Sequence, residues 1–217
     1  MGLRGIIRDQ FRRIGWSVPD WALDEDAAAM RRMARLFSKD DVVIDLGAHI
    51  GKASIEFSHY ARAVYSFEPN PHVFAELQRQ VKNYPNIQIF NKAVSDQTGQ
   101  MELYYEEPKP GRHYEGATIV SGKSNVTYDT HKTVDVISIA EVLDMTDGPN
   151  VVIKMDIEGA EYVVLDAILA SDHLDRIKKI YVECHVDRIE GLAAAKAKTL
   201  AAAKAAGVMD KLDFTWP

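Results

Sequence analysis

From residue 42 onward, short apolar segments alternate with longer amphipathic ones. The apolar segments are rich in β-branched and aromatic residues, and they read VVIDLG, AVYSFEP, IQIFNKAV, VVIKMD and KIYVECH. Runs of this kind predict strands that are buried on both faces, as in a parallel sheet. The segments between them predict helices over residues 52–60, 71–83, 160–171 and 189–206. Strands that alternate with helices in this way predict a doubly wound α/β domain.

Helix boundary signals support this assignment. Asn70-Pro71 places a turn and then a proline at the start of a helix, where proline is favoured. The sequence SIAE at 138–141 is a capping box and predicts one more short helix. Gly207 follows an alanine-rich segment and fits the C-cap of the last helix.

Residues 1–40 predict a helical segment that packs on the main domain, 41–217. Apolar residues at helical spacing lie on one side of residues 3–14, and arginines lie on the other. This basic face predicts a solvated surface, with membrane or RNA contact as the alternative. A second helix is expected over 24–37.

One part of the main domain breaks the alternation. The sequence QMELYYEE has the period of a hairpin strand, and the segment after it is rich in Gly, Pro, Ser and basic residues. Long irregular segments in compact domains are often binding loops. We therefore predict a lid-like insertion at 100–132, with a solvated polar loop as the alternative. Its candidate ligand contacts are Lys109, Arg112, His113, Tyr114, Tyr128 and His131.

Composition narrows the classes of function. The chain has 217 residues, is 47% hydrophobic, and carries a net charge of -6 with a pI near 5.6. This fits one globular domain without a general attraction to nucleic acid or anionic membranes. No apolar run approaches the ~20 residues of a membrane span. The single cysteine, Cys184, excludes an internal disulfide, and we expect a soluble, cytoplasmic protein.

A glycine-containing turn after the first strand predicts a ligand site. In DLGAHIG, Gly47 and Gly51 allow the backbone to turn sharply and to approach a ligand closely. The glycine fingerprint of dinucleotide sites is missing, and Asp45 would disfavour a diphosphate but favour a cation. Glu68, at the end of the next strand, can accept the hydroxyls of a ribose. A ribose, no pyrophosphate and a positive charge indicate S-adenosylmethionine. A nicotinamide or adenine-nucleotide site, and a simple tight turn with a surface Glu, are the alternatives.

Five motifs occur in an order that resembles a known family. VVIDLGAHIG, VYSFEPNP, NKAVSDQTG, VVIKMDIEGAEYVVL and YVECH, between residues 42 and 185, are similar to the FkbM-type methyltransferases. The resemblance implies a class I, S-adenosylmethionine-dependent enzyme that methylates hydroxyl oxygens of small molecules or sugars. It also implies a Rossmann-like, mostly parallel sheet with strand order 3-2-1-4-5-7-6 and the cofactor at the carboxyl ends of the strands. Only VMDKLDFTWP follows Gly207, so we expect the far edge of the sheet to be curtailed.

The resemblance also assigns cofactor contacts by position. The methionine end is expected near the glycine turn, the ribose at Glu68, and the adenine after the third strand. The residues implied are Asp45, Gly47, Ala48, Gly51, Glu68, Asn70, Asn91, Ala93, Val94 and Asp156. One departure is His49, which stands where the family usually has Asn.

Charged residues at the ends of two predicted strands are the candidate catalytic residues. With the period of two in a strand, Lys154 and Asp156 share one face, and Glu183 and His185 share one face of the next strand. We expect Lys154 and Glu183 to form a structural ion pair, because an unpaired buried lysine costs several kcal/mol. Asp156 and His185 are the predicted catalytic residues, with His185 as the general base and Asp156 orienting it or the substrate. For Glu161 we expect only a favourable interaction with its helix dipole.

A divalent metal is the alternative use of these side chains. Asp156, Glu158, Glu183 and His185 could hold a hard cation that lowers the pKa of a hydroxyl. Lys154 in their midst argues against it, so no metal is expected. The favoured function is O-methylation of a small-molecule or saccharide acceptor. RNA ribose 2′-O-methylation and a catalytically idle cofactor-binding module are the alternatives.

Overall fold

The fold is that of a computed structural model. It describes residues 25–106, 117–119, 130–187, 189 and 191–215, together with 6–7, 10–11, 13–16, 18–20 and 23 near the N-terminus. Of the predicted lid contacts, only His131 lies among these residues, and it begins a strand. Lys109, Arg112, His113, Tyr114 and Tyr128 lie outside the described residues.

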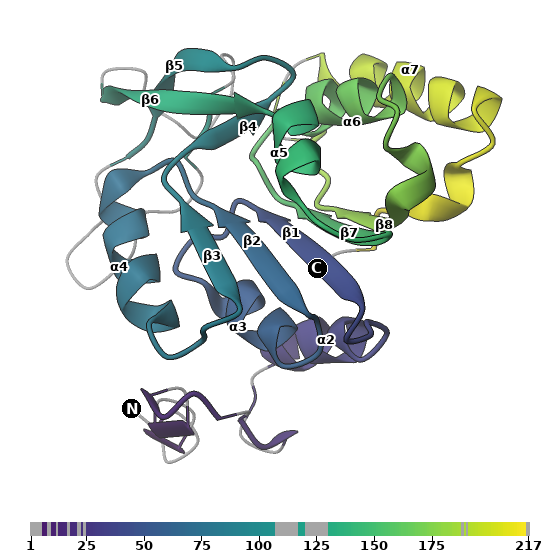
Figure 1. The fold of residues 1–217 in the computed structure, drawn as a ribbon. Helices are drawn as coiled ribbons and strands as arrows, with labels where there is room; N and C mark the ends of the chain where they lie inside the picture. Colours follow the sequence, from purple (N-terminus) through teal and green to yellow (C-terminus); the bar gives the residue numbers. More distant parts are fainter. Residues whose placement is uncertain are drawn as a thin grey trace.

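The main sheet has six strands in the order β3-β2-β1-β7-β8-β9, and every neighbouring pair is parallel. Figure 1 shows β3, β2, β1, β7 and β8 side by side. The predicted order of the first five strands is confirmed. At the far edge of the described sheet, the two-residue β9 pairs parallel with β8, where the family pattern implied two strands. The bounds are β1 (Asp41–Leu46), β2 (Ala63–Phe67), β3 (Ile87–Phe90), β7 (Asn150–Met155), β8 (Ile177–Val182) and β9 (Leu212–Asp213).

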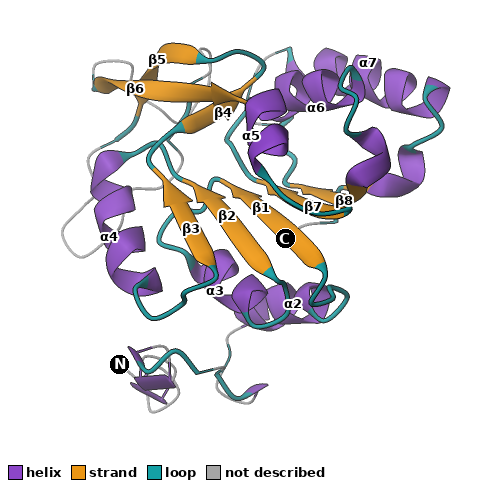
Figure 2. Cartoon of the chain, viewed as in Figure 1, coloured by secondary structure: helices purple, strands orange, loops and turns teal. Residues whose placement is uncertain are grey.

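Helices cover both faces of this sheet (Figure 2), which explains the apolar runs in its central strands. Val43 and Val152 pack with α2 and α3 on one face, whereas Ile44 and Ile153 pack with α5, α6 and α7 on the other. All six residues of β1 are buried. The helix bounds are α2 (Glu25–Ala34), α3 (Lys52–Ser58), α4 (Pro71–Val81), α5 (Ile139–Met145), α6 (Glu161–Leu169) and α7 (Leu192–Ala205).

A second, three-stranded sheet has the order β4-β6-β5 and lies above the carboxyl ends of the main strands in Figure 1. Its strands are β4 (Ala93–Ser95), β5 (Gly99–Tyr104) and β6 (His131–Ser138). The prediction of IQIFNKAV as one strand is wrong. The chain leaves the main sheet after Phe90, and β4 pairs with β6 instead of extending β3. The predicted strand in QMELYYEE is confirmed as β5, which pairs antiparallel with β6.

The helix signals are confirmed. Asn70 caps α4 by accepting from the His72 N–H, and Pro71 is its first residue. Ser138 and Glu141 form both hydrogen bonds of the capping box of α5. Gly207, with φ of +70°, follows the last turn of α7.

The N-terminal part is joined to the domain through a buried ion pair. Arg31 of α2 is 3% exposed and bonds both carboxylate oxygens of Glu56 in α3, the second at 2.9 Å. Its Nη1 also lies 2.7 Å from Asp20. In the described part of the chain, no helix has the length and apolar character needed to cross a membrane.

Candidate active site

A cavity of about 420 Å³ opens at the carboxyl ends of β1, β2 and β7. This is the point where the strand order reverses between β1 and β7, and ligands of open α/β sheets bind there. Of the residues predicted to bind the cofactor, seven line its wall: Gly47, Ala48, Glu68, Asn70, Ala93, Val94 and Asp156. Asp45, Gly51 and Asn91 are not in the wall, and neither is His185.

The turn after β1 is built for close backbone approach. Gly47 has φ of +75°, and a Cβ added there would lie 1.8 Å from the backbone oxygen of Asp156. A Cβ on Gly51 would lie 2.6 Å from Leu77 Cδ1 in α4. His49 has φ of +50°. Histidine and asparagine are both enriched in this left-handed region, which explains how His49 takes a position where Asn is usual.

Glu68 is held rigidly at the end of β2. One carboxylate oxygen accepts from the His49 N–H at 2.9 Å, and the other accepts from the Asn70 N–H at 2.8 Å. Burial raises the pKa of Glu68 to about 7, although these bonds and Lys154 act in the opposite direction. A carboxylate offers about four acceptor positions, so two remain for a ligand.

Asn70 provides a donor beside this acceptor. Its Oδ1 caps α4, but its buried Nδ2 has no hydrogen-bond partner among the described residues. A ribose that bonds Glu68 through one hydroxyl could accept from Asn70 through an oxygen. The residues present therefore fit the ribose of S-adenosylmethionine.

Three predicted contacts act from behind the wall. Asn91 Nδ2 donates to the backbone oxygens of Glu68 and Pro69, at 2.8 and 3.0 Å, and so fixes the turn between β2 and α4. Gly51 allows α3 to pack against α4. Asp45 is completely buried and accepts from Ser54 Oγ at 2.5 Å. These three residues shape the site without lining the cavity.

Lys154 lines the cavity and is paired differently from the prediction. Its Nζ is 3.2 Å from Asp45 Oδ1 and 3.5 Å from Asp156 Oδ2, and it donates to the Gly47 backbone oxygen at 2.8 Å. Burial lowers the pKa of Lys154, but Asp45 and Asp156 outweigh burial and raise it. The expected partner, Glu183, acts as a further nearby charge. It lies beyond the register position of Lys154, whose partner in β8 is Tyr181.

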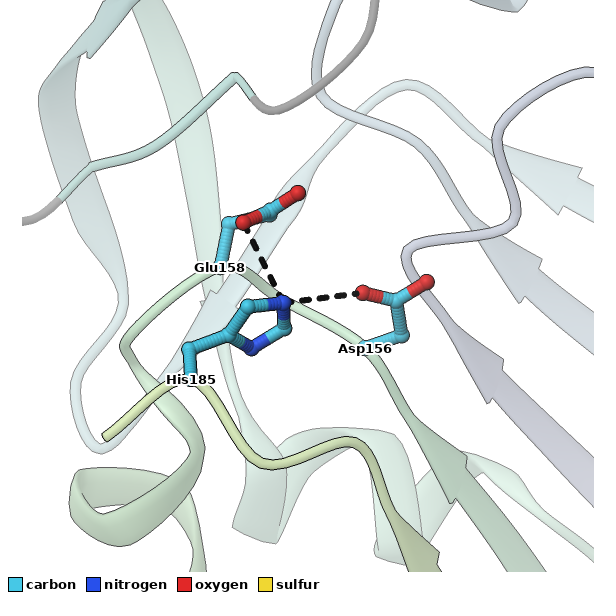
Figure 3. Close-up of side chains that lie close together, drawn as sticks. All are labelled: Asp156, Glu158 and His185. Atoms are coloured by element: carbon cyan, nitrogen blue, oxygen red, sulfur yellow. Dashed lines mark ion pairs between the residues drawn. The ribbon is translucent and has the colours of Figure 1, made fainter. Parts of the chain in front are cut away.

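His185 is surrounded by carboxylates, as Figure 3 shows for Asp156 and Glu158. Its Nε2 lies 3.2 Å from Glu158 Oε2, 3.5 Å from Glu183 Oε1 and 3.8 Å from Asp156 Oδ1. Burial opposes protonation, but Glu161, Glu183 and Glu158 raise the pKa of His185 to about 10. The ring is 1% exposed and lies behind the wall, so the predicted approach to Asp156 is present but direct contact with an acceptor is not.

Glu161 has a larger part than its predicted dipole interaction. It is completely buried, and Oε1 lies 2.8 Å from His185 Nδ1. Both carboxylate oxygens also accept from the Gly159 N–H at 3.0 Å. The sequence held a signal for this, because Glu161 shares helical spacing with the apolar Leu165 and Ile168 and so belongs to the buried face of α6.

One described piece of the predicted lid contacts the site. Ala117 and Ile119 line the cavity, and Thr118 Oγ1 donates to the backbone oxygen of Glu158 at 2.7 Å. This bond ties residues 117–119 to the loop after β7, where Glu158 itself has φ of +53°.

The family model described as the methyltransferase FkbM domain matches residues 45–202. No curated protein matches the chain. Among solved structures, the 23S rRNA methyltransferase ErmE is similar at 16% identity and a TM-score of 0.41, over 73% of this chain and 45% of that chain. The present chain thus spans less than half of that protein.

Two further solved structures are matched over a larger share of their own chains. Precorrin-6y C5,15-methyltransferase from Geobacter metallireducens GS-15 is 16% identical with a TM-score of 0.43, over 83% of this chain and 69% of that one. An rRNA methylase from Streptococcus thermophilus is 10% identical with a TM-score of 0.43, over 82% and 80%.

Proposed function

Because the chain belongs to the FkbM family of S-adenosylmethionine-dependent methyltransferases, we propose that its cavity binds this cofactor and that the protein methylates a hydroxyl oxygen of a small molecule or sugar. The observation that carries the proposal is the position and bonding of Glu68. It is a buried carboxylate, fixed by two backbone N–H groups at the end of β2, with acceptor capacity left for a ribose.

The cofactor contacts follow from the cavity wall. Glu68 and Asn70 Nδ2 would bond the ribose, and Ala93 and Val94 would lie against the adenine. Gly47 and Ala48 would contact the methionine end, where the nearby carboxylates favour a sulfonium and an ammonium group. Asp45 would act indirectly, by holding Lys154.

For the reaction, we assign Asp156 to the acceptor hydroxyl. Asp156 lines the cavity, whereas His185 lies behind the wall and holds the carboxylates from there. Asp156 would accept a hydrogen bond from the hydroxyl and place its oxygen in line with the methyl group, and placement supplies much of the rate. S-adenosylmethionine, when bound, would supply the methyl group as an electrophile, and Asp156 would accept the proton that the acceptor hydroxyl loses.

The charge of the wall supports an uncharged acceptor. The wall also holds Lys52, Lys92 and the paired Lys154, but Asp156, Glu158 and Glu183 gather in its part next to His185. Carboxylates there would repel a phosphate backbone. A small molecule or a saccharide is therefore preferred to RNA.

Calorimetry tests the cofactor, and labelled methyl transfer tests the acceptor. We expect S-adenosylmethionine or its demethylated product to bind at micromolar strength, and NAD to show no binding. With a labelled methyl donor, pools of saccharides and neutral alcohols should accept label, and RNA should not. Binding of NAD without binding of S-adenosylmethionine would overturn the cofactor, and label in RNA alone would overturn the acceptor class.

A further inference from the structure

Asp156 and Glu158, which line the cavity, lie close to His185 behind its wall (Figure 3). Each of the three contributes one ligand atom, and these atoms all lie within 4.8 Å of one another. We infer that this group, which we call the 156–158–185 cluster, binds a divalent cation of the Mn²⁺ type. The sequence alone had favoured a site without metal, because Lys154 lies in the same group of charges.

The strongest observation concerns His185. Its ring is 1% exposed, and its Nε2 has no hydrogen-bond partner among the described residues, although carboxylate oxygens lie 3.2 to 3.8 Å away. A buried polar atom without a hydrogen-bond partner calls for an explanation, and an ion shared between Nε2 and the carboxylate oxygens would supply one.

The other ring nitrogen is fixed in the way that metal ligands usually are. Nδ1 lies 2.8 Å from Glu161 Oε1, and Glu161 is itself held by the Gly159 N–H. Histidine ligands commonly donate their second N–H to a carboxylate, which fixes the tautomer and the direction of the free nitrogen. Glu161 thus directs Nε2 toward Asp156 and Glu158.

The distances suit a shared ion. Two ligands that are each about 2.1 Å from one ion lie about 3.0 Å apart at a right angle and about 3.4 Å apart at a tetrahedral angle. The distances from Nε2 to Glu158 and to Asp156 are 3.2 and 3.8 Å, on either side of the tetrahedral value.

Lys154 does not compete for the same oxygen. It lies 3.5 Å from Oδ2 of Asp156, whereas Oδ1 is the oxygen nearer to His185. Four carboxylates, those of Asp156, Glu158, Glu161 and Glu183, surround the ring. Even a protonated imidazole would leave this cluster negative, and a divalent cation would offset that charge.

The ligand set indicates the class of ion. Carboxylates suit hard cations, whereas an imidazole is accepted by Mn²⁺ more readily than by Mg²⁺, which favours oxygen and water. Asp156 and Glu158 line the cavity, so open coordination positions would face the acceptor. On the proposed function, an ion there would bind the acceptor hydroxyl and lower its pKa. Glu183, also in the wall, would then receive the proton in place of Asp156.

The test is a titration of the full chain with Mn²⁺, after a chelator has removed any bound metal. Electron paramagnetic resonance measures binding, because the signal of free Mn²⁺ is lost when the ion binds. We expect one site per chain, with weaker binding of Mg²⁺. Asp156→Asn and Glu158→Gln should each weaken Mn²⁺ binding at least ~10-fold, and Glu161→Gln should weaken it about 10–100-fold through His185. Asp172→Asn, which removes the same charge from an exposed turn, should leave it unchanged.

Circular dichroism and melting curves identify variants that fail to fold, and the half-buried Glu158 is the substitution best placed to fold normally. Absence of Mn²⁺ binding at millimolar concentration, or equal binding by Glu158→Gln and Asp172→Asn, would overturn the inference. Calorimetry with S-adenosylmethionine on the same samples keeps the two proposals separate. Cofactor binding without Mn²⁺ binding removes the metal site alone, and Mn²⁺ binding without cofactor binding removes the proposed function alone.

Discussion

Lys154 holds together the strand ends that form the wall of the cavity. Its ammonium group is almost fully buried, and it joins the end of β1 to the end of β7 through Asp45, Asp156 and the Gly47 backbone oxygen. Asp45 and Lys154 are direct register partners, so their pairing depends on the alignment of two strands more than a hundred residues apart. Removing Lys154 would leave the completely buried Asp45 without its cationic partner.

We therefore predict that Lys154→Met destabilises the protein by about 3–5 kcal/mol, because Asp45 would remain buried and unpaired. Chemical denaturation measures the effect. The exposed Lys132→Met in β6 is the control and should stay within about 0.5 kcal/mol of the wild type. Asp45→Asn combined with Lys154→Met should recover part of the loss. Strictly additive effects of the two changes would show that the residues are not coupled.

A second prediction at this scale concerns the ribose. Glu68→Ala should weaken S-adenosylmethionine binding by roughly 1–3 kcal/mol, because buried ribose hydroxyls would lose their acceptor. Isothermal calorimetry of the variant gives the change directly. Asp135→Ala removes a carboxylate from the exposed side of β6 and should bind as the wild type does. Equal affinities in both variants would argue against ribose at Glu68.

Sequence periodicity predicts which face of a strand these side chains share, but it does not predict which residues they pair with. It puts Lys154 and Asp156 on one face because side chains in a strand alternate. It could not show that Asp45 is the partner of Lys154, since the register between β1 and β7 is set by the packing of the whole sheet. For the same reason Glu183 was assigned to Lys154, two positions away from its register partner Tyr181.

At the scale of elements, the turn after β1 and the loop after β7 must touch for the cavity to form. Gly47 lies against the backbone of Asp156, and its N–H donates to the Phe67 backbone oxygen at 3.1 Å. The turn therefore has neighbours on both sides, and it positions His49 and Ala48 toward β2. A side chain at Gly47 would separate the strand ends.

We predict that Gly47→Ala lowers the melting temperature and weakens S-adenosylmethionine binding by at least ~10-fold. The added methyl group would meet the Asp156 oxygen, and the φ of +75° is unfavourable for alanine. Thermal denaturation and calorimetry of the same sample measure both effects. Gly99→Ala is the matched control, because nothing lies within 4 Å of a Cβ there and its φ is ordinary. A Gly47→Ala protein with wild-type affinity would contradict this account of the turn.

The elements themselves divide into those that the sequence reveals and those that it does not. Strands such as β1 and β7 are predictable because they are buried on both faces and each contains the apolar run Val-Val-Ile. The three-residue β4 and the two-residue β9 are too short to have a period. Their pairing is decided by neighbours far along the chain, so IQIFNKAV could not be divided correctly from its own residues.

For the whole molecule, the balance of buried charge connects the site to stability. Several ionisable groups lie buried at the carboxyl ends of the main strands, beside the cavity, among them Asp45, Glu68 and Lys154. Glu68 is the clearest case, because its pKa is raised to about 7 from 4.5 mainly by burial. An acid with a raised pKa binds a proton in the folded state at a pH where the unfolded chain has lost it. The stability of the protein must therefore depend on pH through this residue.

The sign follows from linkage. Between about pH 4.5 and pH 7, the folded state holds more protons at Glu68 than the unfolded state does, so its contribution to stability falls as the pH rises and levels off above pH 7. The full change corresponds to about 3 kcal/mol. Relative to Glu68→Gln, the ligand-free wild type should lose up to this amount of unfolding free energy across that range. Urea denaturation at several pH values measures it, and Asp135→Asn should follow the wild type.

Cofactor binding should reverse this dependence, because a ribose and a sulfonium favour the ionised carboxylate. The affinity for S-adenosylmethionine should therefore fall as the pH drops below 7 in the wild type, with uptake of a proton on release of the ligand. In Glu68→Gln the affinity should be lower and should lack this slope. Calorimetry in two buffers of different ionisation enthalpy measures directly how many protons are exchanged on binding.

Stability curves of the wild type and Glu68→Gln that run parallel from pH 4.5 to pH 7 would mean that Glu68 is already ionised without ligand. The predicted coupling of cofactor binding to proton release would then be wrong. The affinity of Glu68→Ala for S-adenosylmethionine would still test the ribose contact.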